Sequence, residues 1–173
     1  MAIVIAATVA VSTHRRDEYL QAARISIEPA RVQLELDLTP GIAVAEATLR
    51  DIDRNHDGSL SPDEQRAYAL VVLAALRLEI DGTPVPVQLQ ASQFPSRAAV
   101  RRGEGTIRLH LAATLPQLST GAHHLLFRNR HHPNRSVYLA NALVPESAHV
   151  AVTAQRRDDR QTELTIDFVL SPR

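Results

Sequence analysis

Alternating apolar and polar positions dominate this chain, and they predict β-strands. In two early runs, 24–28 and 32–38, every second side chain is apolar, such as Ile25 and Ile27 in the first run. This is the period of a strand that buries one face. The residues between the runs, 28–31, include a proline and suit a tight turn. The two runs are therefore expected to form an antiparallel hairpin.

The same pattern returns along the rest of the chain. Further strands are expected at 77–80, 85–89, 106–115, 124–130, 136–144, 150–155 and 163–170. Asp81-Gly82 and the charged segment 156–161 lie between neighbouring runs and suit turns or hairpin loops. Short strands separated by polar turns predict mainly antiparallel β structure with a sandwich-like arrangement.

The apolar period changes from two to about 3.6 between residues 42 and 76. Apolar residues recur at helical spacing on both sides of a polar segment: Ala45, Leu49 and Ile52 before it, with Thr48 on the same face, and Tyr68, Ala69, Val72, Leu73 and Leu76 after it. Ser61, Pro62 and two acidic residues form a typical helix start. We therefore expect an α+β fold, with a helix–loop–helix insertion at 42–76 between strands of the β domain.

The polar segment, 53–64, has oxygen-bearing side chains at the spacing of a twelve-residue calcium loop. Positions one, three, five, seven, nine and twelve are Asp53, Asn55, Asp57, Ser59, Ser61 and Glu64. Position seven needs only a backbone carbonyl, position nine can act through a water, and the closing glutamate supplies two oxygens. Gly58 occupies position six, where the chain must turn sharply.

This segment resembles the EF-hand family over 42–76, and the resemblance implies that these six residues bind Ca²⁺. Hands usually pair through the backbone near the eighth loop residue, here Leu60, but the sequence contains no second calcium loop. We expect the helix pair to pack on the β domain, with calcium acting as a structural staple. The positive charges of Arg54 and His56 beside three carboxylates predict modest affinity.

Length and composition narrow the class of protein. The 173 residues suit one domain, expected at 14–173, and the formal net charge of zero argues against a nucleic-acid surface. The chain has no cysteine, which excludes disulfides and thiol nucleophiles. It also has no lysine, a composition typical of a GC-rich bacterial coding sequence.

An apolar run at 3–11 resembles the core of a secretory signal, so 1–13 is interpreted as a signal-peptide remnant. The run is too short to span a membrane as a helix, and a simple β-strand is the alternative. Segments 17–22 and 136–143 resemble exported bacterial proteins that carry an EF-hand in a β-rich domain. We therefore expect an extracytoplasmic binding domain with a protein partner at the cell envelope.

Four histidines offer a rival chemistry at 123–132. His123, His124, His131 and His132 bracket one expected strand and could hold zinc or copper. If the strand is extended, however, the two pairs lie roughly 20 Å apart, and solvated loop histidines are the alternative. No catalytic motif is found, so no enzyme activity is expected. Two other hypotheses stay open: a calcium-responsive switch that exposes a partner-binding groove, and a metalloenzyme or zinc- or copper-binding protein that uses the histidine segment.

Overall fold

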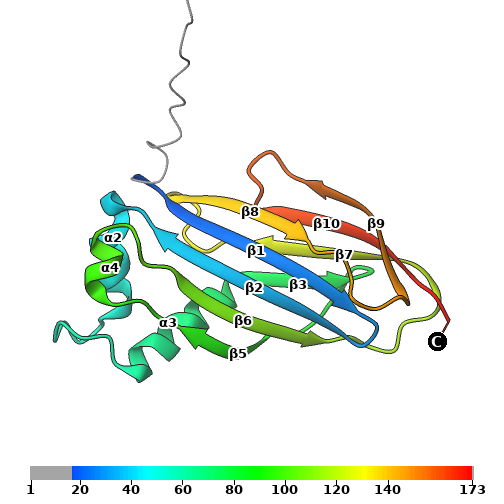
Figure 1. The fold of residues 1–173 in the computed structure, drawn as a ribbon, viewed down its shortest axis with the longest axis horizontal. Coiled ribbons are helices and arrows are strands. Elements are labelled where there is room, and N and C mark those ends of the chain that lie inside the picture. Colours follow the sequence, from blue (N-terminus) through cyan, green and yellow to red (C-terminus); the bar gives the residue numbers. More distant parts are fainter. Residues whose placement is uncertain (1–16, 173) are drawn as a thin grey trace, which may run out of the picture.

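Two five-stranded sheets form most of the computed structural model, which describes residues 17–172 (Figure 1). The first sheet has the order β5 (Gln88–Gln93), β6 (Ile107–Thr114), β2 (Arg31–Pro40), β1 (Tyr19–Glu28) and β8 (Ser136–Ala142). The second has the order β4 (Thr83–Pro84), β3 (Leu76–Ile80), β7 (Gly121–Asn129), β10 (Glu163–Leu170) and β9 (Val150–Arg157). The expectation of mainly antiparallel β structure with a few helices is confirmed. The expected signal remnant, 1–13, lies outside the described residues.

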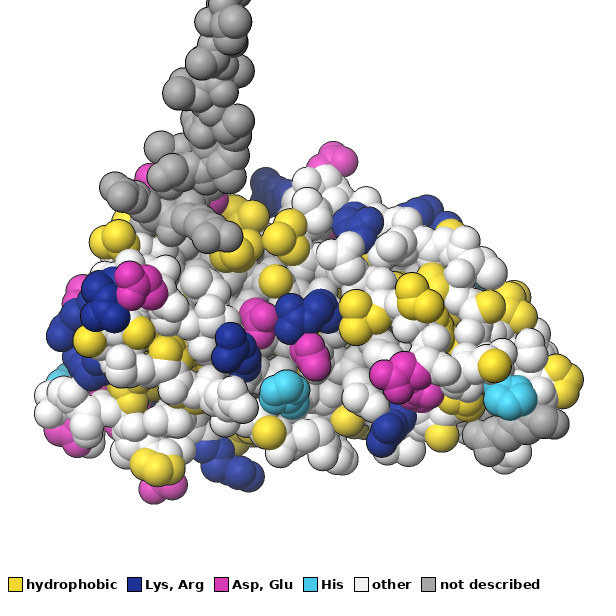
Figure 2. Space-filling model, viewed as in Figure 1, with side chains coloured by type: hydrophobic (Ala, Val, Ile, Leu, Met, Phe, Trp, Pro, Cys, Tyr) yellow, Lys and Arg dark blue, Asp and Glu magenta, His cyan; other side chains and the backbone are white. Residues whose placement is uncertain are grey.

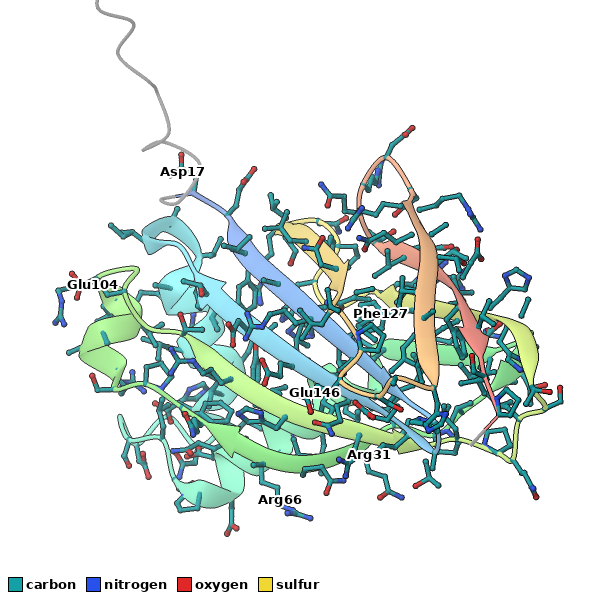
Figure 3. All side chains as sticks on the ribbon, turned by 45° about the vertical axis from the view of Figure 1, so that its right-hand side comes forward. Asp17, Arg31, Arg66, Glu104, Phe127 and Glu146 are labelled. Carbon is teal, nitrogen blue, oxygen red and sulfur yellow. The ribbon has the colours of Figure 1, made fainter. Side chains whose placement is uncertain are left out.

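The core lies between the sheets and follows directly from the alternating pattern. Along β1 every second residue is buried, and Ile25 and Ile27 are fully inaccessible to solvent. Phe127 and Phe168 belong to the same hydrophobic cluster from the second sheet, and Figure 3 shows Phe127 in the interior. Burying an aliphatic or aromatic side chain of this size contributes about 2 kcal/mol, so these positions hold the two layers together.

The hairpin of β1 and β2 is confirmed, with Glu28 opposite Arg31 in antiparallel register. The edge strand β8, however, pairs in parallel with β1, so that Ser136 lies opposite Tyr19. The chain reaches β8 from β7, which belongs to the other sheet, so no hairpin fixes the direction of β8. Side-chain period shows which residues face the core, but it says nothing about strand direction.

One predicted strand is wrong. Residues 85–89 do not form a single strand, because the chain makes the short β4, leaves the ladder, and resumes pairing in β5. Pro84 and Pro86 have no backbone N–H to donate, which explains the break. The short helix α4 (Arg97–Arg101) was not predicted, since its five residues are too few to show a helical period.

The predicted helix pair is present between β2 and β3. Its helices are α2 (Ile42–Ile52) and α3 (Pro62–Ala74), and they lie with α4 at one end of the two sheets (Figure 1). The buried residues of α2 are the ones its period predicts: Ala45, Thr48, Leu49 and Ile52. In α3, Tyr68, Ala69 and Val72 join the core cluster between the sheets. Between residues 17 and 172, none of the helices has the length and apolar character needed to cross a membrane.

Basic and acidic side chains are interspersed on the face shown in Figure 2. On the outer side of the first sheet, Arg24 forms ion pairs with Glu35 at 2.9 Å and with Asp37 at 3.1 Å. Such cross-strand pairs leave no continuous surface of one sign on this face, as the balanced charge of the sequence suggests.

Candidate metal centre

Three carboxylates converge in the loop between α2 and α3. Asp53 ends α2, Asp57 lies in the middle of the loop, and Glu64 is in the first turn of α3. One oxygen from each residue lies within 4.8 Å of the others. Asp53 is 3% exposed and Glu64 is 9% exposed, whereas Asp57 is exposed. Negative charges held this close repel each other, so the arrangement favours a bound cation.

Asp53 provides the clearest sign of a metal ligand. Its Oδ2 accepts a hydrogen bond from the Gly58 N–H at 3.2 Å and pairs with the guanidinium of Arg97. Its Oδ1 is buried and has no hydrogen-bond partner among the described residues. A buried carboxylate oxygen without a partner is costly, and a hard cation would satisfy it. The orphaned atom therefore fits the calcium ligand expected at loop position one.

Asp57 is fixed by short-range contacts within the loop. Its Oδ1 accepts from the Ser59 N–H at 2.7 Å, and its Oδ2 accepts from the Asn55 side-chain amide at 2.9 Å. The Ser59 N–H, followed by the Asn55 amide, lowers the pKa of Asp57. The Asn55 Oδ1 in turn accepts from the Asp57 N–H at 3.0 Å. These contacts keep Asp57 ionised and order the middle of the loop.

The tight reversal of the loop depends on left-handed backbone conformations. Gly58 has a φ of 84° and His56 has a φ of 60°. A side chain at position 58 would meet no atom within 4 Å, so the glycine is needed for its conformation and not for space. The glycine expected at loop position six is thus explained by the backbone.

Glu64 ties the two ends of the loop together. Its Oε1 accepts from the Arg54 N–H at 3.0 Å, and its Oε2 accepts from the Ser61 N–H at 3.0 Å and the Ser61 hydroxyl at 2.7 Å. The hydroxyl of Ser61, followed by its N–H, lowers the pKa of Glu64. Ser61 also accepts from the Glu64 N–H, which completes the predicted capping box of α3. Glu64 is therefore ionised at neutral pH and lies beside the other two carboxylates.

Two residues at the site were missed by sequence reasoning. Arg97 comes from α4, 44 residues from its partner Asp53, and no local pattern links them. Gln65, one residue after the loop, donates its side-chain amide to the Leu60 carbonyl at 2.7 Å. Leu60 packs against the small cluster that joins Leu49 of α2 to Val100 of α4. The backbone that usually meets a second calcium loop thus has a partner within this chain.

Replacing Gln65 with Ala is expected to lower the free energy of unfolding by about 1 kcal/mol, because a partly buried carbonyl loses its donor. Urea unfolding measures this change. Arg66→Ala is the matched control, since Arg66 lies next along α3 but points into solvent (Figure 3). Equal stability of the two variants would show that the bond to Leu60 contributes nothing.

The four histidines do not form a shared site. His123 contacts the Asp81 carboxylate at 2.7 Å and the Ser119 carbonyl at 2.8 Å. His124 instead contacts Asp167, while His131 lies beside Tyr68 at 3.1 Å. The expectation of solvated histidines is wrong for His123 and His131, which are 6% and 2% exposed because they occupy inward-facing positions. Within residues 17–172, the carboxylate cluster is the one grouping of three or more metal-ligating side chains.

Comparisons with known proteins do not assign this chain to a family. No family model matches the chain, and no curated protein and no solved structure is significantly similar to it. The functional conclusion therefore depends on the loop and its surroundings.

Proposed function

We propose that this protein binds Ca²⁺ through a single EF-hand loop. The ligands are Asp53, Asn55, Asp57, Ser59, Ser61 and Glu64, with Ser59 acting through its backbone carbonyl. The observation that carries the proposal is the buried, unpartnered Oδ1 of Asp53 in a cluster with two further carboxylates. An oxygen-only ligand set of this kind favours calcium over zinc or copper, which prefer nitrogen and sulfur ligands.

The role of the ion is structural. Ile52 of α2 and Tyr68 and Val72 of α3 are buried in the main core. Opening the helix pair would expose these side chains, so a calcium-responsive switch is less favoured. Calcium instead stabilises the folded state by mass action, as a staple on the helix insertion of an extracytoplasmic binding domain.

Calorimetric titration tests the proposal. We expect one calcium ion per chain, with a Kd on the order of 10⁻⁴ to 10⁻³ M, and weaker binding of magnesium. At about 10 mM calcium, mass action then adds about 2 kcal/mol to the free energy of unfolding. For a chain of this size the melting temperature should rise by roughly 4–8 °C. No calcium heat and no thermal shift at this concentration would contradict the proposal.

Arg97→Gln is expected to lower the stability of the ion-free protein and to raise its affinity for calcium. The side chain of Arg97 is 22% exposed and pairs with the Asp53 side chain, which is 5% exposed. Loss of this pair should destabilise the ion-free protein by about 2 kcal/mol. The same change removes a positive charge that repels calcium, and the calcium affinity should rise about tenfold. Unfolding in chelator and calorimetry in calcium measure the two effects.

Arg101→Gln is the control for this pair of effects. Arg101 lies on the same short helix and pairs with Glu46, but its side chain is 52% exposed. Its replacement should change neither the free energy of unfolding in chelator nor the calcium affinity appreciably. A calcium affinity that is unchanged, or falls, in Arg97→Gln would contradict the proposed competition between Arg97 and the ion.

A further inference from the structure

A surface cavity adjoins the proposed calcium loop on the helix pair. This cavity of about 380 Å³ lies between the end of α2, the start of the loop and α3. The residues that line it come from α2, the loop, α3 and the segment before β8: Arg50, Asp51, Arg54, His56, Ala67, Tyr68, Val71 and His132. Its volume lies within the range of small-molecule sites, and it combines apolar and charged walls as such sites do.

Two arginines in the wall of this cavity form no ion pair with any residue that the structure describes. Among residues 17–172, neither Arg50 nor Arg54 lies within ion-pair distance of a carboxylate. The Nε of Arg50 donates to the backbone carbonyl of Glu46 at 3.3 Å, and the carboxylate of Glu46 pairs with Arg101 at 2.6 Å. Two arginines with no ion-pair partner in the described part of the chain therefore line the same hollow, and guanidinium groups of this kind can bind an anion.

The one carboxylate in the cavity wall is already neutralised. Asp51 pairs with Arg135, and its Oδ2 lies 3.3 Å from the His132 ring. Arg135 also contacts His132 at 2.8 Å, and its buried Nε has no hydrogen-bond acceptor among the described residues. Arg135 thus offsets the charge of Asp51, so this carboxylate does not neutralise Arg50 or Arg54.

We infer that this cavity binds a small organic anion. Its carboxylate or phosphate group is held between Arg50 and Arg54, and its apolar part lies against Ala67 and Val71. Guanidinium groups bind both kinds of anion through paired N–H donors, so the recognised chemistry is the same for either head group. The open, solvent-facing position of both arginines predicts binding in the millimolar range.

The position of Arg54 couples this cavity to the calcium loop. Arg54 is the second loop residue, and its backbone N–H contacts Glu64. A calcium ion in the loop would add positive charge close to the anion and raise the affinity of the cavity by about threefold. Reciprocal linkage requires that the anion raise calcium affinity by the same factor. This coupling rests on the proposed calcium function, whereas anion binding itself does not.

Nuclear magnetic resonance titrations with hexanoate, hexyl phosphate and inorganic phosphate test the inference in chelator, on the full chain. We expect saturable shifts of the amides of residues 50–56 and 67–71 with both hexyl compounds. Arg50→Gln and Arg54→Gln should each weaken binding at least fivefold, whereas Arg66→Gln should not, because Arg66 of α3 points into solvent away from the fold (Figure 3). Repeating the hexanoate titration in calcium should show the threefold gain.

Three results would overturn parts of the inference. Hexanoate binding that is equal in the wild type and in both arginine variants would show that these residues do not hold the anion. Inorganic phosphate binding as tightly as hexyl phosphate would exclude a role for the apolar wall. Binding in chelator that does not change when calcium is added, in a protein that binds calcium by calorimetry, would reject the coupling while leaving the calcium site intact.

Discussion

Glu64→Gln is expected to lose about 100-fold in calcium affinity. In the proposed site the glutamate would supply a full negative charge at about 2.5 Å from a doubly charged ion, and the neutral amide of glutamine would replace it poorly. The amide can still accept from Ser61, so the variant should fold and retain α3. Calorimetry should show no calcium heat at millimolar concentration, and circular dichroism should show unchanged secondary structure.

Asp63→Asn provides the matched control for Glu64→Gln. Asp63 is the preceding residue in the first turn of α3 and is exposed, so the substitution removes the same charge from nearly the same place. Calcium affinity should change by less than about threefold, because the exposed carboxylate of Asp63 attracts the ion only through a screened, long-range electrostatic interaction. An equal loss in both variants would mean that net charge, and not coordination by Glu64, attracts the ion.

Lowering the pH from 7 to 5 is expected to lower the free energy of unfolding by about 2 kcal/mol through His131. Burial, followed by the charges of His132 and Arg135, lowers the pKa of His131 to about 3. The unfolded chain takes up a proton near its ordinary pKa of about 6.5, whereas the folded chain does not. The stabilisation is therefore complete above about pH 6.5 and declines progressively as the pH falls towards 3.

Several hydrogen bonds hold His131 in its buried position. Its Nε2 lies 3.1 Å from the Tyr68 hydroxyl, which in turn lies 2.8 Å from the Tyr19 hydroxyl. The His131 carbonyl accepts from Gln21 and Tyr138 at 2.7 and 2.8 Å. This hydrogen-bond network joins α3 to the first sheet. Protonation of His131 would therefore weaken the packing of the helix pair against that sheet.

Urea unfolding at pH 7 and pH 5 measures this dependence, with His131→Gln as the variant that removes it. His123 serves as the control because the Asp81 carboxylate raises its pKa. A raised pKa contributes stability below about pH 6.5 and loses it as the pH rises, so His123→Gln should make the loss of stability on acidification larger. A His131→Gln variant with the wild-type pH dependence would contradict this assignment.

The sequence was sufficient for features that depend on neighbouring residues. The β1–β2 hairpin follows from two alternating runs and one turn, and the capping box of α3 follows from the spacing of Ser61 and Glu64. The carboxylates of the loop also lie within a short segment, so their convergence was predictable from spacing alone.

Features that depend on distant segments could not be predicted in the same way. Arg97 reaches Asp53 only because α4 packs beside α2 in the folded chain. The parallel direction of β8 depends on the crossing from one sheet to the other, and the burial of His131 depends on three separate elements that contact it. None of these contacts leaves a period or a motif in the sequence.

A crystal structure of the protein grown in about 10 mM calcium tests the central claim most directly, since this concentration exceeds the expected Kd. We predict one ion bound by the six proposed ligand residues: Asp53, Asn55, Asp57, Ser59, Ser61 and Glu64. Oδ1 of Asp53 is among the ligand atoms, and both carboxylate oxygens of Glu64 are turned towards the ion. A loop without an ion at this concentration, with Glu64 still bonded to Ser61 and Arg54, would contradict it.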